Sequence, residues 1–187
     1  MAANKLVCGV QLVPMLNHCV TFAKCGGVVQ SHAAVVRCLA ILIQKYKNTH
    51  SRVEQWVPTM QRTAPGDQAR LDVVFIDNAC LAYLDVAMAA PPYAADAALM
   101  TAAEAKPGYM ARRAEINKFC RYPGHTLIPF VLETIGRPGD HAKQFIQHLA
   151  VDHEPQSGVV REIWSCMQGV MHGTSLQQQL AAAQGAG

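Results

Sequence analysis

The chain has 187 residues, enough for one domain with its own core and a short appended segment. Hydrophobic residues make up 51% of it, which excludes a disordered chain, and the net charge of +3 permits a nucleic-acid partner without requiring one. No apolar run has membrane-spanning length, and the first residues do not resemble a signal peptide. We therefore expect an intracellular protein, nuclear or cytoplasmic and not secreted, without a membrane partner. Its seven cysteines should then be thiols or metal ligands rather than disulfides.

The first part of the chain predicts a Cys/His-rich segment, a helix and three strands. Residues 1–31 carry the Cys/His-rich segment, and Ser31 is a suitable cap for a helix that extends to residue 47. A short strand at 52–57 carries Glu54 and precedes a polar loop. Two β-branched apolar runs, 71–76 and 80–88, flank a turn and predict a hairpin.

The second part predicts helices around one further strand. The Ala/Pro-rich stretch 89–107 should break regular structure, and a charged helix should follow it. Pro129 lies inside the next strand, which favours an edge position or a bulge, and Asp140 should cap the helix after it. This order predicts an α/β (α+β) fold with a mixed four-stranded sheet flanked by helices. The expected divisions are an N-terminal segment, a core and a C-terminal helix with a Gln/Ala-rich tail, at 1–31, 32–150 and 151–187.

Two aspartates interrupt the apolar runs of the predicted hairpin. Asp72 lies in the first strand and Asp85 in the second. A buried carboxylate is costly unless it is paired or bound to a metal, and two on adjacent strands can converge on one cation. Hard cations such as Mg²⁺ take carboxylate ligands and activate water for phosphodiester hydrolysis. For either aspartate alone, a position facing solvent is the better interpretation.

The charged helix that follows the hairpin supplies a candidate cation. Lys118 shares a helix face with Arg121 and Tyr122. If this helix packs beside the two aspartate strands, Lys118 can orient an attacking water or stabilise developing negative charge. An exposed Glu115–Lys118 surface pair is the alternative, and the residues by themselves favour it.

These motifs together resemble a known family. The run Arg70-Leu71-Asp72, followed by Asp85 after twelve intervening residues, resembles the R-P-D…D signature of the restriction-endonuclease-like domain of site-specific non-LTR retrotransposons, a branch of the PD-(D/E)XK nuclease superfamily. The runs 114–122 and 128–136 are similar to that family's "AExxKxxKY" and "vPFvvETfG" segments. His32 resembles the start of the family's first helix, and Glu54 stands where the family often has a strand glutamate. The departures from the pattern are Leu71 for proline, Ser31 for arginine, and Arg137-Pro138-Gly139 for a Gly-Trp-Gly-like turn.

The resemblance implies a PD-(D/E)XK core that nicks target DNA for retrotransposon insertion. Asp72 and Asp85 would hold Mg²⁺ or Mn²⁺, Lys118 would be the active-site lysine, and Glu54 would be an auxiliary ligand. A reverse transcriptase domain of the same polyprotein is then an expected partner. The alternatives are an inactive nucleic-acid-binding remnant of a retroelement and a protein-interaction module. Phosphate contacts are expected from a group of arginines, although solvated faces are the more usual meaning of such charges: Arg70, Arg113 and Arg121.

The family also carries a zinc knuckle ahead of the nuclease core. Zinc takes four nitrogen or sulfur ligands, usually with one closely spaced cysteine pair, and the Cys/His-rich segment lacks such a pair. A degenerate knuckle that binds nothing therefore ranks level with a zinc site. The candidate zinc ligands form two alternative sets: Cys19, Cys25, His32 and Cys38, or Cys8, His18 and Cys25 with one ligand lost where the chain begins. We expect the remaining cysteines and both tryptophans to lie in the core: Cys80, Cys120, Cys166, Trp56 and Trp164.

Overall fold

The computed structural model describes residues 27–61, 68–90, 97–123, 126–134 and 136–171. The zinc-ligand candidates Cys8, His18, Cys19 and Cys25 lie outside the described residues, as does the Gln/Ala-rich tail. Among the helices of the described residues, none combines the length and the hydropathy needed to cross a membrane.

Four strands form one mixed sheet, as the order of the predicted elements indicates. The strands lie in the order β1-β2-β3-β4, with bounds Ser51–Gln61, Gln68–Asp77, Cys80–Ala89 and Ile128–Glu133. The first three are antiparallel neighbours, and β4 runs parallel to β3 after a crossover through α3 (Ala97–Ala105) and α4 (Tyr109–Arg121). Pro129 lies in β4, which is an edge strand as predicted.

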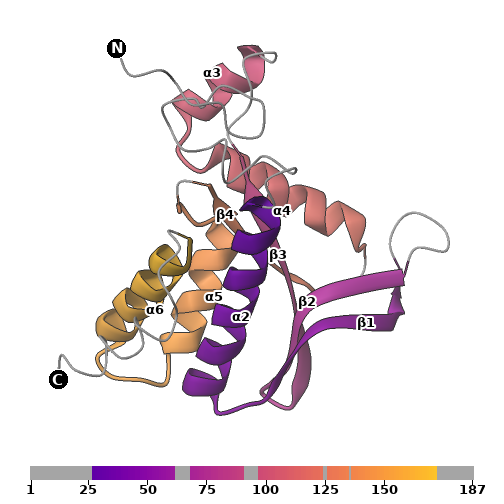
Figure 1. The fold of residues 1–187 in the computed structure, drawn as a ribbon, viewed down its shortest axis with the longest axis vertical. Coiled ribbons are helices and arrows are strands. Elements are labelled where there is room, and N and C mark those ends of the chain that lie inside the picture. Colours follow the sequence, from indigo (N-terminus) through magenta and orange to yellow (C-terminus); the bar gives the residue numbers. More distant parts are fainter. Residues whose placement is uncertain (1–26, 62–67, 91–96, 124–125, 135, 172–187) are drawn as a thin grey trace.

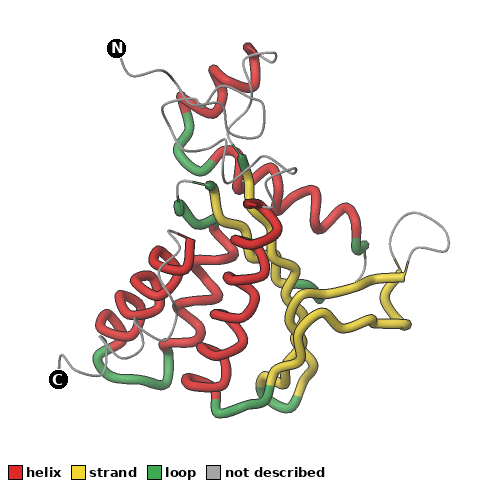
Figure 2. Tube along the Cα trace, viewed as in Figure 1, coloured by secondary structure: helices red, strands yellow, loops and turns green. Residues whose placement is uncertain are grey.

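Three helices pack together on one face of the sheet: α2 (Gly27–Lys47), α5 (Asp140–Ala150) and α6 (Gln156–Met171). Figures 1 and 2 show them side by side, with the β1–β2 hairpin projecting away from them. The main core lies between this layer and alternate residues of the strands. Because α6 contributes to this core, the expected division at residue 150 separates helices that pack as one unit. The largest core side chains include Leu39, Leu42, Phe75, Phe130, Ile146 and Ile163.

Helix α4 covers part of the opposite face. Ala111 packs with Val131 and Ala89, and Tyr122, directly after the helix, packs with Val57 and Leu71. The alternation of Phe130, Val131 and Leu132 between the two layers explains why β4 is buried on both faces despite lying at an edge. Helix α4 therefore lies against the sheet beside β3 and β4, in a position to carry side chains to the two aspartate strands.

Several predicted boundaries are wrong. Helix α2 begins at Gly27, so Ser31 lies inside it and the expected division after residue 31 cuts a helix. Strand β1 extends to Gln61, because pairing with β2 overrides the turn signal of the loop. The stretch 89–107 contains α3, whose Ala-rich sequence has high helix propensity despite the prolines around it. Asp140 is the first residue of α5, and Gly139 occupies the cap position.

The β2–β3 hairpin turns through two residues in a left-handed conformation. Asp77 pairs with Cys80, and between them Asn78 and Ala79 have φ of 48° and 65°. Asparagine tolerates this region, whereas alanine is strained there by about 1 kcal/mol. We expect Ala79→Gly to raise the free energy of unfolding by about that amount in urea titrations. Ala40→Gly, in the middle of α2, is the control and should lower it by about 1 kcal/mol; equal effects of the two changes would contradict the turn assignment.

An ion pair ties α6 to α2 and makes the fold sensitive to acid. Lys45 Nζ contacts Glu162 Oε1. Partial burial raises the pKa of Glu162, but the hydrogen bond and charge of Lys45 outweigh it and hold the pKa below its usual value of 4.5. The contribution to stability is complete above the unfolded pKa and is lost as pH falls through the folded pKa. Glu162→Gln should flatten the acid side of the stability–pH curve, measured by urea unfolding between pH 3 and 7, roughly the range in which carboxylates titrate; an unchanged slope would contradict this role.

Candidate active site

Strands β2 and β3 separate at the two aspartates. Their ladder ends at the pair Val73–Leu84, and its next step would place Asp72 opposite Asp85. Beyond this pair, a side-chain contact replaces the backbone hydrogen bonds of the ladder: Asp72 Oδ2 accepts a hydrogen bond from the Val86 N–H at 2.7 Å. The fork between the strands therefore brings both carboxyl groups to one place.

Helix α2 supplies a histidine to the fork. His32 Nε2 lies 3.3 Å from Asp72 Oδ2, and both side chains are mostly buried. His32 was expected among the zinc ligands, but in the structure its ring nitrogen contacts the aspartate. The feature of the sequence that points to this position is the resemblance of His32 to the start of the family's first helix. The zinc interpretation assigned the same residue to a different site.

Helix α4 supplies the lysine. The Lys118 ammonium forms an ion pair with Asp85 Oδ1 and donates to the Val86 carbonyl at 3.3 Å. The Lys118 side chain is 13% exposed and that of Asp85 is 7% exposed, so water screens this pair only weakly. The structure therefore places Lys118 beside the two aspartates, and not in a surface pair with Glu115.

The two carboxylates have opposite pKa shifts. Burial raises the pKa of Asp72, but the hydrogen bond and charge of His32 and the Val86 N–H outweigh it, and the pKa lies below its usual value. The pKa of Asp85 lies above its usual value, because burial and the neighbouring Asp72 carboxyl raise it by more than Lys118 lowers it. The hydrogen bond with Asp72 raises the pKa of His32 against the effect of burial. Two carboxyl groups therefore lie close together, with His32 beside Asp72 and Lys118 beside Asp85.

The donor set fits a hard divalent cation. Within the described ranges, no group of three or more His, Cys, Asp or Glu side chains is arranged to hold a metal ion. Mg²⁺ needs only one or two carboxylates, because it keeps several waters and takes further ligands from substrate phosphates. Asp85 Oδ2 is buried and receives no hydrogen bond from the described residues. Its free lone pairs beside the Asp72 carboxyl suit Mg²⁺ or Mn²⁺ chemically.

The other predicted site residues take no part in the described contacts of the fork. Glu54 has φ of 53° in β1 and is exposed, and its carboxylate pairs with Arg70. Glu54 occupies the register position opposite Asp72, between the pairs Val53–Val73 and Gln55–Leu71. Its carboxylate is held by Arg70 and contacts neither aspartate in the described structure, so its role as an auxiliary ligand stays a prediction. Arg113 and Arg121 are exposed on α4, where they are accessible to a ligand but contact neither aspartate in the described structure.

A buried glutamate, which the sequence suggested only as half of a surface pair with Lys118, fixes α4 against α5. Glu115 is 3% exposed, and its Oε1 accepts the His141 N–H at 3.0 Å, in the first turn of α5. His141 Nδ1 lies 3.2 Å from Glu115 Oε2. Because the positive end of a helix dipole favours a carboxylate, Glu115 stabilises the start of α5 from a neighbouring helix. Lys118 lies three residues further along α4, so this contact also sets the position of the lysine.

Two of the isolated cysteines and one tryptophan contradict the expectation of core positions. Cys38 and Cys166 are buried, and burial raises the pKa of Cys38 to about 12. Cys80 and Cys120 are exposed. Trp164 packs against the core, whereas Trp56 of β1 is 59% exposed.

No protein-family model matches the chain, and a search of curated proteins found no match. The function is therefore argued from the geometry of the fork.

Proposed function

We propose that this chain is a metal-dependent DNA endonuclease domain of the PD-(D/E)XK type, similar to the domain that nicks target DNA for insertion of site-specific non-LTR retrotransposons. The observation that carries the proposal is the meeting of three elements at one point: Asp72 of β2, Asp85 of β3 and Lys118 of α4. A structural ion pair needs one carboxylate for one lysine. Here a second carboxylate lies beside the pair, and a buried oxygen of the first is without a donor among the described residues.

Asp72 and Asp85 would hold Mg²⁺ or Mn²⁺. When bound, the cation would supply charge neutralisation at the phosphate and a lowered pKa of bound water. The residues around it have separable roles. His32 and the Val86 N–H both contact Asp72 Oδ2 and hold this carboxylate in one orientation. The reverse transcriptase domain expected from the resemblance would use the 3′ end that the nick releases.

Lys118 would act on the attacking water and the phosphate. Its ammonium is held by Asp85 Oδ1 and the Val86 carbonyl, which leaves one of its three N–H donors for a ligand. A fixed cation close to the phosphate stabilises the negative charge that develops during hydrolysis. The pair with Asp85 keeps the ammonium at the fork before the substrate arrives, so little reorganisation is needed.

The test is incubation of the purified chain with supercoiled plasmid. Conversion to nicked circles is expected with Mg²⁺ or Mn²⁺ and not with EDTA. Asp72→Asn should remove the nicking activity. The control is Asp77→Asn, on the same strand, because Asp77 pairs with His148. Absence of nicking with both metals, or an Asp72→Asn variant as active as the wild type, would overturn the proposal. DNA binding without cleavage would favour the inactive remnant.

A further inference from the structure

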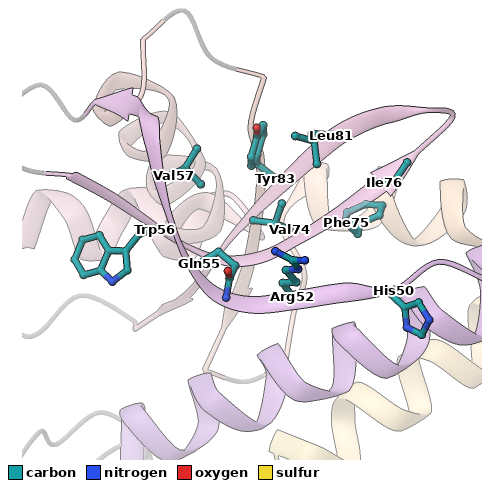
Figure 3. A pocket seen from close by; sticks show the side chains of 10 residues that line it. All are labelled: His50, Arg52, Gln55, Trp56, Val57, Val74, Phe75, Ile76, Leu81 and Tyr83. Carbon is teal, nitrogen blue, oxygen red and sulfur yellow. The ribbon is translucent and has the colours of Figure 1, made fainter.

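A groove on the sheet, separate from the fork, carries an exposed aromatic residue and an arginine that pairs with no carboxylate of the described residues. It has a volume of about 530 Å³ and is lined by residues of β1, β2 and β3, together with His50 in the turn before β1. Figure 3 shows Trp56 at one end, His50 at the other and Arg52 between them. The residues that line it are His50, Arg52, Gln55, Trp56, Val57, Val74, Phe75, Ile76, Leu81 and Tyr83.

Strand pairing explains how these side chains form one surface. Arg52 pairs with Val74, and Val74 pairs with Tyr83, so the three form a row across the sheet on one face. Ile76 and Leu81 form the next row. Helix α4 covers the sheet only beside β3 and β4 and at the Tyr122 end, so these rows remain uncovered in the described structure.

The apolar residues of this groove are unusually accessible. Eight large apolar side chains are exposed among the described residues, and three of them line the groove: Trp56 at 59%, Leu81 at 57% and Ile76 at 54%. A concentration of exposed apolar groups in a hollow marks a binding surface. Tyr83 is half-buried inside the groove. Trp56 lies at its end and, in Figure 3, projects from the other side of β1 than Val57, so the exposed indole is the main aromatic surface open to a ligand.

The charges of the groove favour a polyanion. None of the described residues that line it is acidic, and no described carboxylate pairs with Arg52. Glu54, between Arg52 and Trp56 on β1, is held by Arg70, whose guanidinium carbon lies 6.0 Å from the centre of the Trp56 ring. Proteins that bind single-stranded nucleic acid combine aromatic platforms for the bases with cations for the backbone. A protein partner would have to bury Arg52 without an ion pair or contribute an acidic side chain that pairs with it.

We infer that this groove binds a single nucleic-acid strand with unpaired bases, of which one stacks on Trp56 at the end of the groove while Arg52 contacts the phosphates. The strand can be DNA or RNA, because stacking and phosphate contacts are common to both. The groove begins close to the fork: Trp56 pairs with Arg70, two residues before Asp72 on β2. Binding here does not need the proposed cleavage, and it supplies a place for a strand that has left the duplex.

The test is fluorescence anisotropy of labelled oligonucleotides with the full chain in EDTA, so that no cleavage occurs. The probes are oligothymidine, oligouridine and a DNA duplex of equal length. We expect oligothymidine or oligouridine to bind more tightly than the duplex. Tighter binding of oligothymidine would identify DNA as the ligand, and tighter binding of oligouridine would identify RNA. Trp56→Ala should weaken single-strand binding by about tenfold or more, whereas Trp56→Phe, which keeps a stacking ring, should stay within about threefold of the wild type.

A second variant tests the charge. Arg52→Ala should weaken binding and lower the slope of affinity against salt by about one unit. Arg161→Ala, an exposed arginine of α6, is the matched control and should bind as the wild type does. Circular dichroism of each variant excludes unfolding as the cause.

Three outcomes would overturn the inference: single strands that bind no better than the duplex, binding that Trp56→Ala does not change, or no binding of any strand. Self-association that Trp56→Ala abolishes, without nucleic-acid binding, would assign the groove to a second copy of the chain. The plasmid assay is independent of these results. Nicking without groove binding would support the cleavage proposal and contradict the groove inference. Groove binding without nicking would support the groove inference and contradict the cleavage proposal.

Discussion

Asp85→Asn is expected to abolish metal-dependent nicking without harming the fold. Asparagine has nearly the same shape, but it removes the negative charge that a divalent cation needs. Loss of one group that stabilises transition-state charge costs roughly a hundredfold to a thousandfold in rate, and loss of a metal ligand should reach at least that. The measurement is the initial rate of plasmid nicking under saturating Mg²⁺, with Asp152→Asn, an exposed partner of Lys47, as the control.

The same substitution should leave stability unchanged or raise it by about 1 kcal/mol, the size of one net hydrogen bond. Asp85 is buried beside another carboxylate, and its Oδ2 is without a donor in the described structure. An asparagine amide relieves this repulsion and can donate to Asp72. Lys118→Met is the matched contrast, because it leaves Asp85 buried without its cation and should lower stability by about 3 kcal/mol.

The two variants therefore separate function from folding. Both variants should be inactive. Their free energies of unfolding in urea should move in opposite directions or differ by several kcal/mol, because Asp85→Asn removes a buried negative charge whereas Lys118→Met leaves one without its cation. An Asp85→Asn variant that is strongly destabilised would show that the carboxylate is a structural partner of Lys118 and would contradict its assignment as a ligand.

Gly139→Ala is expected to destabilise the protein and to slow nicking. A Cβ at Gly139 would lie 2.1 Å from Glu115 Oε1, so the carboxylate would have to move and lose the His141 N–H. Displacing a buried charge from its partner costs about 3 kcal/mol. Because Glu115 and Lys118 lie on one face of α4, the shift should also move the ammonium away from Asp85.

Urea unfolding and the nicking rate measure the two effects of Gly139→Ala. Gly158→Ala, in the first turn of α6, is the matched control, since its Cβ meets only Pro155 at 3.4 Å. In a Glu115→Ala background, Gly139→Ala should cost less than in the wild type, because the clashing group is gone. Additive costs would show that the clash is not with Glu115.

The fold was largely predictable because the strands carry strong β-branched patterns and the helices α2, α5 and α6 have clear apolar stripes. The mixed sheet followed from that order and is confirmed. What failed was local. Prolines around the Ala-rich stretch concealed α3, and the turn signal after Val57 concealed the end of β1, which pairing with β2 stabilises. Long-range pairing cannot be read from a local pattern.

The site was predictable only in part. Asp72, Asp85 and Lys118 were named from their residue types and the family resemblance, and the structure brings them together; their roles remain a proposal. The pairing of Glu54 with Arg70 and its left-handed φ of 53° could not be foreseen from the sequence. Glu115 was overlooked because a glutamate three residues before a lysine on a helix usually forms a surface pair. Trp56 was expected in the core because it lies in an apolar strand, and the strand pattern does not reveal which part of a sheet the helices leave uncovered.

The two edges of the sheet carry irregularities that bear on how the protein behaves at high concentration. Pro129 has no N–H to offer along the outer side of β4, and the left-handed Glu54 interrupts the regular outer side of β1. An incoming strand from another molecule would meet a missing donor at one edge and a bend at the other. The protein is thereby protected against sheet-to-sheet aggregation at both ends, while the face between them stays open to a ligand.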